Sequence, residues 1–541
     1  MTASRSKYGD LDRLRGRAET LAGAWGARAR TSTTVGQERA ILRLFGVHGL
    51  DRAGRPLAGA TVDRWLAGAH DGLGGGIALP FAMALLEYDL EPQQLALDVS
   101  SGAVDLALEA ELLREADRRA LAETEARRLV AAALERIDTD RTARRELQDL
   151  LGEPRRPWLG TTLAEPDLDG ALDELVALAE AGFDLLRVEV PMGRELADRL
   201  QDAGLEAPSW QPRDRAGRAT TAEGDMDAAD PAPAGSQRAL ARLRRVADGV
   251  AAERRGYVRL ATAIPPLGVP EGAVVAAFER VDLVEADPMA EIVAGGVDPD
   301  RSLADHAFAR RLHRRADTLV SIGPGPLVVA PDLASGVPAD AATRSGRALA
   351  LQLVGVELAR ADGIAPDRLV VGAYPAWLAE ESAATARILA EVAVRRALFP
   401  GFLIRFDEPG GPGVESPAAV AWPFVAAAAL GWTGEDAVVM RRAHHDGRRV
   451  GGESRAAVAI AADILAVAPM SPLTGAALEH AQAIVRAAQV TLDRLADLGW
   501  RAVVGDAPRT VDRGRPAPRA LGGDAVAERT ETFDPLAAFE R

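Results

Sequence analysis

Eight short apolar runs alternate with amphipathic stretches between Pro157 and about Met440. Runs of this kind, bounded by turn-forming residues, are typical of strands buried on both faces of a parallel sheet. Eight strand–helix units in one region favour a closed (β/α)8 barrel over an open doubly wound sheet. The predicted strands cover residues 158–162, 185–190, 257–263, 281–285, 318–322, 369–373, 402–406 and 437–440, and the helices between them include 169–182, 236–253, 340–362, 379–397 and 415–430.

The regions on either side of the barrel are predicted to be helical. Helical patterns cover residues 10–29, 37–46, 60–69, 78–87, 91–97 and 104–150, and further ones cover 453–466 and 474–498. We therefore predict an α/β chain with a helical N-terminal accessory region over 1–150, a TIM-barrel domain over 151–440, and a helical C-terminal region with a polar tail over 441–541. Proline and glycine interrupt residues 205–235, which predicts a long polar loop at the barrel mouth.

Composition excludes several kinds of function. The chain has no cysteine, so disulfides, thiolate catalysis, iron–sulfur clusters and cysteine-type zinc sites are excluded. The formal net charge of −15 and the lack of a basic stretch argue against binding to nucleic acid. No apolar run approaches the ~20 residues that span a bilayer, and residues 1–10 lack the apolar core of a signal peptide. We expect a cytoplasmic protein that does not bind membranes.

Lysine is almost missing from this chain. Lys7 is the only one, so arginine supplies the rest of the 64 basic residues. The codon usage of a GC-rich genome explains this bias, yet the bias has a chemical consequence. An enzyme that uses pyridoxal phosphate rests as a Schiff base with a lysine. Because Lys7 lies in a polar tail, we expect that this chain alone does not form a self-sufficient enzyme of that class.

Polar residues stand at or just after the ends of the predicted strands. In a (β/α)8 barrel these ends share one face, which carries the active site. Each residue alone is more often one that caps a helix or lies in a loop, but together they predict a polar mouth suited to an amino-acid-like ligand. We take Glu285, Asp287 and Arg405 as the candidate substrate contacts. The full set of strand-end residues is Thr161, Thr162, Glu189, Thr262, Glu285, Asp287, Ser321, Tyr374, Arg405, Asp407 and Glu408.

A metal site is not expected. His444 and His445 are adjacent rather than four residues apart on a helix, so a helix would not bring both onto one metal ion. We expect this pair to lie in a loop at the barrel rim.

Residues 33–49, Thr-Thr-Val-Gly-Gln-Glu-Arg-Ala-Ile-Leu-Arg-Leu-Phe-Gly-Val-His-Gly, predict a capped helix. Thr33 or Thr34 caps its start, and Gly46 and Gly49 end it. A glycine-rich turn follows at 71–76, but no strand precedes it, so it is a weak candidate for a phosphate-binding loop. Together the two segments resemble the N-terminus of the large (alpha) subunit of lysine 5,6-aminomutase.

The resemblance to this family extends over most of the chain. Residues 219–224, Ala-Thr-Thr-Ala-Glu-Gly, are similar to the family's Ala-Thr-Thr-Glu-Gly loop with one residue inserted. Residues 396–400, Arg-Ala-Leu-Phe-Pro, are similar to its Arg-Glu-Leu-Phe-Pro before strand seven. Further similar segments follow the family's order at 257–260, 278–282, 298–305 and 520–536.

The resemblance implies an activity, two cofactors and a partner. The family's enzymes, which act in lysine degradation, are isomerases that use adenosylcobalamin and pyridoxal phosphate to move an amino group to a neighbouring carbon through radicals. A small cobalamin-binding partner subunit supplies the Schiff-base lysine and the cobalt-ligating histidine. On this chain the resemblance implies cofactor-binding roles for Thr220, Thr221, Glu223, Gly224, Thr262 and Ser321.

Several positions that matter in the family are changed here. The tyrosine that stacks on the pyridoxal ring falls at Ala263, the aspartate that holds the substrate amino group at Gly296, and the substrate-side lysine at Ser382. An acidic segment at 225–230 would repel a phosphate or a carboxylate. We therefore expect a divergent large subunit with another substrate. The alternatives are a non-catalytic or altered-function paralogue that keeps the fold and partner surface, and a cobalamin radical mutase without pyridoxal phosphate.

Overall fold

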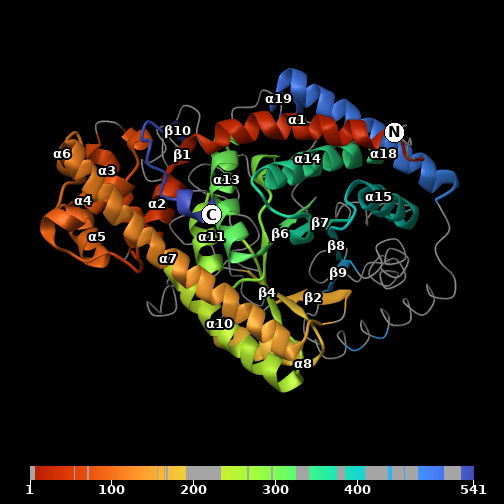
Figure 1. Ribbon diagram of the computed structural model, residues 1–541. Helices are drawn as coiled ribbons and strands as arrows, with labels where there is room; N and C mark the ends of the chain where they lie inside the picture. The colour runs from red at the N-terminus through yellow and green to blue at the C-terminus, as the bar shows by residue number, and fades with distance from the viewer. Residues whose placement is uncertain are drawn as a thin grey trace.

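The computed structural model describes residues 7–53, 55–69, 72–154, 156–163, 165, 168–189, 233–264, 267–293, 297–323, 340–373, 384–408, 436–441, 452, 456, 473–504 and 526–540. Within these ranges, eight parallel strands in chain order close into a barrel (Figure 1). Trp158 of the first strand lies opposite Val438 of the last, so the sheet has no free edge. The predicted (β/α)8 barrel is confirmed. Its strands are β2 (Trp158–Thr162), β3 (Leu185–Glu189), β4 (Arg259–Ala263), β5 (Leu283–Glu285), β6 (Leu319–Ile322), β7 (Leu369–Gly372), β8 (Leu403–Asp407) and β9 (Ala437–Arg441).

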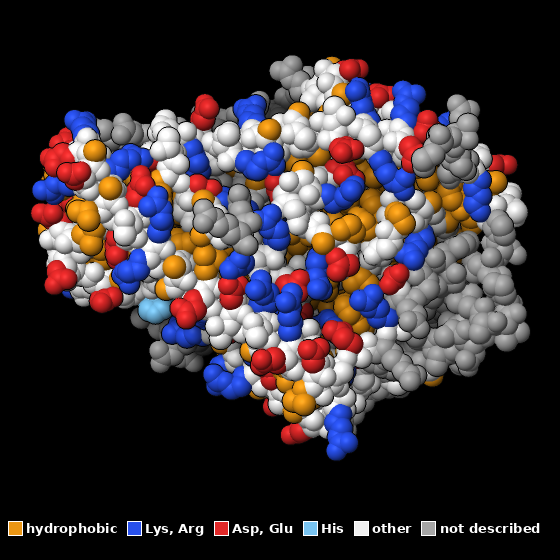
Figure 2. Space-filling view, viewed as in Figure 1, with side chains coloured by type: hydrophobic (Ala, Val, Ile, Leu, Met, Phe, Trp, Pro, Cys, Tyr) orange, Lys and Arg blue, Asp and Glu red, His pale blue; other side chains and the backbone are white. Residues whose placement is uncertain are grey.

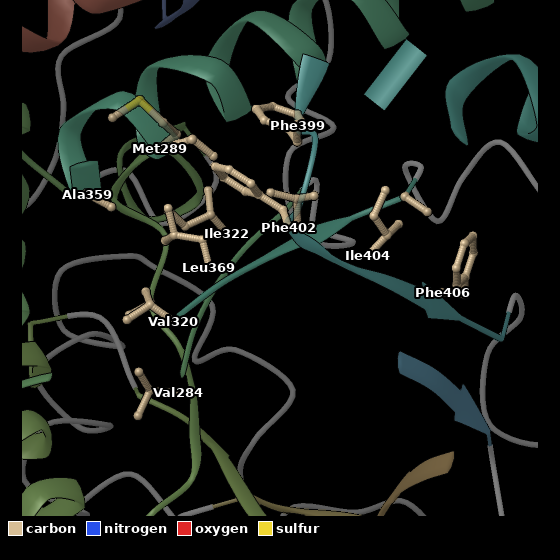
Figure 3. Close-up of a cluster of buried hydrophobic side chains, with 14 of the residues drawn as sticks. Val284, Met289, Val320, Ile322, Ala359, Leu369, Phe399, Phe402, Ile404 and Phe406 are labelled. Carbon is tan, nitrogen blue, oxygen red and sulfur yellow. The ribbon is translucent and has the colours of Figure 1, made fainter. Parts of the chain in front are cut away.

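The side chains of each strand alternate between the bore of the barrel and the surrounding helices. Figure 3 shows outward-facing side chains, including Val320, Ile322, Leu369, Ile404 and Phe406, in one apolar cluster. Because both faces of the sheet are buried, the strands are apolar along most of their length. A separate apolar cluster fills the bore and consists of Trp158, Leu185, Ala261, Leu283, Leu319, Val370, Leu403, Val438 and Met440.

Helices cover the outside of the barrel. One of them, α14, packs against both α18 and the N-terminal helix α1 (Figure 1). The contact between α14 and α18 is close, because a Cβ at Gly346 would lie 2.8 Å from the backbone nitrogen of Ala488. The helices of this shell are α1 (Leu11–Arg30), α8 (Leu168–Glu180), α10 (Pro233–Arg254), α11 (Val269–Phe278), α12 (Pro288–Val293), α13 (Pro299–Ala316), α14 (Ala341–Ala361), α15 (Ala384–Leu398) and α18 (Gly475–Leu498).

The helices predicted between the strands at 169–182, 236–253 and 340–362 are confirmed to within a few residues. The predicted C-terminal boundary of the loop 205–235 is wrong, because α10 already begins at Pro233. Proline is tolerated there because it lies in the first turn of the helix. The rest of that loop, the helix predicted at 415–430 and most of the one at 453–466 lie outside the described residues.

A helical lobe packs against one side of the barrel. Its helix α2 contacts α11 of the barrel shell. Its long helix α7 packs on α4 within the lobe and on α11 and α13 of the shell. The single helix predicted over 104–150 is wrong: the chain turns at Leu113–Glu115, where backbone nitrogens bond to the carbonyls of the preceding turn. This break lets the first piece pack on α4. The lobe consists of α2 (Val35–Leu44), α3 (Leu57–Gly68), α4 (Ala78–Tyr88), α5 (Pro92–Ser101), α6 (Leu106–Leu112) and α7 (Ala116–Leu151).

The C-terminal segment 526–540 is built into this lobe. Its strand β10 (Val526–Glu528) pairs antiparallel with β1 (Ser32–Thr34). Phe533, Leu536 and Phe539 are buried in the same apolar core as the helical lobe. The predicted polar tail therefore ends in a docked segment. The division of the chain into domains at 150 and 440 stays a prediction.

Arginines and carboxylates interleave over the face of the molecule shown in Figure 2. Among the described residues, no helix combines the length and the apolar character needed to cross a membrane.

Candidate functional site

Charged side chains meet inside the barrel at the C-terminal ends of its strands. The Arg405 guanidinium contacts two carboxylates, with Nη1 2.8 Å from Glu285 Oε1 and Nε 3.0 Å from Asp407 Oδ2. Arg187 of β3 approaches the same Glu285 oxygen, with its Nε at 3.0 Å. Ser321 of β6 accepts a hydrogen bond of 3.0 Å from Arg405. We call these five residues the mouth cluster.

Strand register explains why these residues meet. Glu285 pairs with Ser321 across β5 and β6, and Arg405 of β8 pairs with Gly372 of β7. Each charged residue of the cluster lies two or four positions beyond an apolar residue of the bore, so the cluster forms the next layer toward the strand ends. The Arg405 side chain is 9% exposed and that of Asp407 is 46% exposed, which places Asp407 on the solvent side.

Ion pairing determines the charge state of the cluster. Desolvation alone would raise the pKa of Glu285, but the guanidinium groups of Arg187 and Arg405 hold that pKa below its ordinary value. Desolvation opposes the charge of Arg405 as well, yet Asp407 and Glu285 raise its pKa. Two cations therefore face two anions. A ligand with one ammonium and one carboxylate group can replace an internal ion pair and leave the charge balanced.

Asp287 lies just outside the bore, at the start of α12. Its Oδ1 accepts a hydrogen bond of 2.9 Å from the backbone nitrogen of Met289, and the backbone nitrogen of Gly323 also donates to its carboxylate. Desolvation raises the pKa of Asp287 to about 6, against the lowering effect of these hydrogen bonds and of nearby His306. The structure thus makes Asp287 a helix cap beside the mouth. Its role as a substrate contact stays a prediction.

Thr262 does not line the bore. Its side chain lies on the outward face of β4 and donates a hydrogen bond of 3.2 Å to the carbonyl of Val188. The expectation that it faces the mouth is wrong, because strand parity turns it toward the helices. Thr161, one residue before the end of β2, also faces outward and is buried.

Other predicted site residues lie outside the described part of the chain. Of Glu189 only the backbone is described, and its register position is opposite Ala263. Two further predicted residues are described: Thr162 is the last residue of β2, and Glu408 forms an ion pair of 3.1 Å with Arg441 beside the mouth. The predicted residues outside the described ranges are Thr220, Thr221, Glu223, Gly224, Tyr374, His444 and His445.

Arg187 is the site residue that the sequence reasoning missed. It lies inside β3 rather than after it, so a search of strand ends passes over it. A signal was present, because Arg187 is two residues after Leu185 and so shares its inward face.

An arginine and a tryptophan pack together at the opposite end of the bore. The Arg259 guanidinium stacks on the ring of Trp158, with its carbon 3.8 Å from the ring centroid, and it pairs with Glu153. Together with the apolar side chains that fill the bore, this stacked pair occupies the end of the barrel opposite the mouth cluster.

The glycine-rich turn at 72–75 packs against another part of the protein. A Cβ at Gly74 would lie 2.7 Å from the carbonyl of Glu528 in the docked C-terminal segment. Glu38 of α2 places its carboxylate at the start of α4, where it accepts a hydrogen bond of 2.8 Å from the nitrogen of Ile77. The weak prediction of a phosphate loop is wrong, because an internal carboxylate already occupies this helix N-terminus.

The predicted helix cap at Thr34 is confirmed, since its hydroxyl accepts a hydrogen bond of 3.1 Å from the nitrogen of Gln37. The same hydroxyl donates to Asp305 of α13, so the segment joins the lobe to the barrel shell. Over the described ranges no group of three or more His, Cys, Asp or Glu side chains could hold a metal ion.

A closed (β/α)8 barrel with a polar cluster at its strand ends defines a TIM-barrel protein with its charged cluster on the face where such barrels carry their sites. The family model described as the D-lysine 5,6-aminomutase TIM-barrel domain of the alpha subunit matches residues 7–203 and 233–410. The chain belongs to this family, as a divergent member.

Two curated relatives support the assignment. The chain is 26% identical over 341 residues to the lysine 5,6-aminomutase alpha subunit of Acetoanaerobium sticklandii, a match that covers 63% of this chain and 59% of the relative. It is 24% identical over 379 residues to that of Fusobacterium nucleatum, covering 70% and 66%. These matches span less than two thirds of the relatives' length.

Among solved structures, the chain is similar to dihydropteroate synthase from Anaplasma phagocytophilum. The sequence identity is 14%, the TM-score is 0.35, and the match covers 56% of this chain and 97% of that one. A likeness at this level carries no argument about function.

Proposed function

We propose that the chain is the large subunit of an adenosylcobalamin-dependent, lysine 5,6-aminomutase-like complex that isomerises an amino acid by 1,2-migration of its amino group. Membership of an aminomutase family supports this proposal. The observation that carries it is the mouth cluster, which gathers two guanidiniums and two carboxylates at the open end of the barrel.

The proposed role of this chain is to bind and orient the substrate. Arg405 is the candidate group for the substrate carboxylate, and Glu285 is the candidate for an ammonium group. Their ion pair already has a hydrogen-bonding distance of 2.8 Å, so a zwitterion can exchange with it without leaving a buried charge unpaired. The apolar side chains that fill the bore beneath the cluster would help to keep water out during radical chemistry.

The described residues do not fit pyridoxal phosphate. Ala263 offers no ring for stacking, and both guanidiniums of the mouth cluster face carboxylates. Lys7 packs its ammonium 5.0 Å from the Tyr8 ring centroid, and its carbonyl accepts a hydrogen bond from Gln482 of α18, outside the barrel. The family's Thr-Thr-Glu-Gly segment lies outside the described residues.

On the strength of the family membership, we assign cobalamin, which would supply the radical when bound, to a small partner subunit, together with any Schiff-base lysine and the cobalt-ligating histidine. The two alternatives, a paralogue that keeps fold and partner surface without catalysis and a radical mutase without pyridoxal phosphate, differ in the cofactors that such a complex would carry. The absorbance spectrum of the purified complex distinguishes them.

Lysine itself is expected to be a poor substrate. The changes at Ala263, Gly296 and Ser382 remove a stacking ring and two charged contacts, and each charged contact in a dry site is worth about 2–5 kcal/mol. The test is an assay of the two-subunit complex with both lysine enantiomers, beta-lysine and ornithine. Robust turnover of lysine would show that the register at these positions is mistaken. A complex that binds none of these amino acids and isomerises none of them would favour the non-catalytic paralogue.

Replacing Arg405 tests the mouth cluster directly. R405M should weaken amino-acid binding by about 2–5 kcal/mol, or roughly 30-fold or more, because the ligand carboxylate loses its charged partner. The matched control is R396M, since Arg396 pairs with Asp436 at 3.4 Å at the other end of the barrel. Calorimetric titration of both complexes with an amino acid that binds the wild type measures the difference. Equal affinities of the two variants for the amino acid would show that Arg405 does not contact the ligand.

A further inference from the structure

Gln352 connects two separate strand ends at the barrel mouth. It lies in the middle of α14, and its side chain is buried, at 1% exposed. Its Nε2 donates to the carbonyl of Ile322 at 3.1 Å and to the carbonyl of Gly372 at 3.0 Å. These two carbonyls belong to the last residues of β6 and β7. One side-chain amide thus bridges the end of the β6–β7 pair.

Each of these carbonyls shares a peptide unit with a backbone nitrogen that donates a hydrogen bond to a candidate site residue. The peptide after Gly372 presents the nitrogen of Ala373, which donates to the Arg405 carbonyl at 2.8 Å. The peptide after Ile322 presents the nitrogen of Gly323, which donates to the Asp287 carboxylate. A peptide unit is planar, so fixing its carbonyl also fixes the direction of its N–H.

We infer that Gln352 is a positioning residue that sets Arg405 and Asp287 relative to each other at the mouth. The assignment of a function to the mouth itself rests on the proposed function above. No contact between Gln352 and a ligand is implied, because Gln352 acts through the two strand-end peptides.

The orientation of the amide is fixed by its other partner. Gln352 Oε1 accepts a hydrogen bond of 2.8 Å from Arg395 Nε on α15, and arginine can only donate. Nε2 must therefore face the two carbonyls. Arg395 in turn forms an ion pair with Glu391, and both side chains are fully buried. Such a pair is costly to disturb, so it holds the amide in place.

Glycines bring the backbone close enough for this arrangement. A Cβ at Gly355, one turn after Gln352 on α14, would lie 3.1 Å from Ile322 Cγ2 and 3.4 Å from Asp287 Oδ1. A Cβ at Gly323 would lie 3.3 Å from the Cα of Gly372. Close approach of α14 to β6, and of the two strand ends to each other, thus depends on the lack of side chains here.

The test compares Q352L with a matched control, T61V. Thr61 is also fully buried, and its hydroxyl donates to the carbonyls of Leu57 and Ala96 in the helical lobe, away from the mouth. In Q352L, hydrogen exchange should speed up in peptides that cover 319–323 and 369–373, and the two-subunit complex should bind its amino acid about tenfold or more weakly. T61V should lower Tm by a similar amount, but it should change neither the hydrogen exchange of these peptides nor the affinity for the amino acid.

If Q352L does not fold, Q352E replaces it, since its carboxylate fills the same space and accepts from Arg395 but cannot donate to the carbonyls. Unchanged exchange at both strand ends, or the same change in T61V, would overturn the inference. If the wild-type complex binds no amino acid, the proposed function fails, and the exchange measurement alone decides the role of Gln352.

Discussion

Arginine side chains cap the C-terminal ends of two described helices. Arg144 donates to the carbonyls of Ala316 and Asp317 at the end of α13, and Arg254 donates to the carbonyls of Ala179 and Phe183 after α8. A guanidinium reaches two carbonyls at once because its donors form a planar fork, whereas an ammonium is a point charge. The bias against lysine therefore has structural use, and replacing these arginines by lysine is not a conservative change.

At the same scale, Asp287 should make stability depend on pH. Its folded pKa of about 6 lies above the unfolded value of 3.8, so its contribution is complete below pH 4 and is lost as the pH rises through 6. D287N can still accept the cap hydrogen bond from Met289, but it has no charge to bury. The free energy of unfolding of D287N relative to the wild type should therefore increase from pH 4 to pH 7.5, by up to about 3 kcal/mol. Denaturant unfolding at both pH values measures this difference.

D340N serves as the control with the opposite sign. Asp340 caps α14 from an exposed position, and its hydrogen bonds to Thr343 lower its pKa. Its contribution is present at neutral pH and lost in acid. A D287N variant that gained nothing at pH 7.5 would show that the charge of Asp287 is stabilised by groups outside the described residues.

Among the elements, α14 has the most demanding position. It lies between the barrel and α18, and it makes close contacts on both sides through glycines. Gly346 faces α18, and Gly355 faces β6. In an isolated helix, alanine would be preferred over glycine by about 1 kcal/mol. Packing overrides that preference here, and the same helix carries Gln352 between the two contacts.

G346A should therefore destabilise the protein. A Cβ at this position would lie 2.8 Å from both the nitrogen of Ala488 and the carbonyl of Ile484, and backbone atoms cannot move aside cheaply. We expect a loss of about 1–3 kcal/mol in the free energy of unfolding. In the control, G249A on α10, no atom beyond the local backbone of the helix lies within 4 Å of the added Cβ, so a gain of up to about 1 kcal/mol is expected. Thermal unfolding of both variants gives the comparison, and a stabilised G346A would mean that α18 packs differently in solution.

On the scale of the whole molecule, buried polar pairs join the helical lobe to the barrel shell. Arg43 of α2 forms an ion pair of 2.9 Å with Glu271 of α11, and Thr34 bonds to Asp305 of α13. Breaking such a pair leaves a charge buried without a partner, so the two parts are expected to unfold together rather than separately.

The single lysine gives a test for the whole chain. Because Lys7 lies beside α18 and outside the barrel, borohydride reduction of the chain incubated with pyridoxal phosphate should leave no pyridoxyl group that supports activity. Peptide mapping by mass spectrometry locates any adduct. An active single-chain enzyme with a reduced adduct on Lys7 would overturn the two-subunit proposal.

Sequence reasoning recovered what local pattern encodes. The strands were predictable because burial on both faces makes them apolar, and Glu285, Ser321 and Arg405 were predictable because strand ends share one face. Arg187 lies within its strand and Thr262 faces outward by strand parity, so a selection based on strand ends alone misses the first and includes the second. The break near Leu113 carries neither glycine nor proline, so only packing on α4 reveals it.

The pairing of β1 with β10 has a consequence for the order of folding during synthesis. Phe533, Leu536 and Phe539 complete the core of the lobe, although they leave the ribosome long after the helices they cover. While the ribosome synthesises the barrel, part of the apolar surface of the lobe therefore stays exposed to solvent. Chains with such exposed apolar surface are prone to aggregate. A ribosome stalled after the barrel would hold a lobe that a chaperone still recognises.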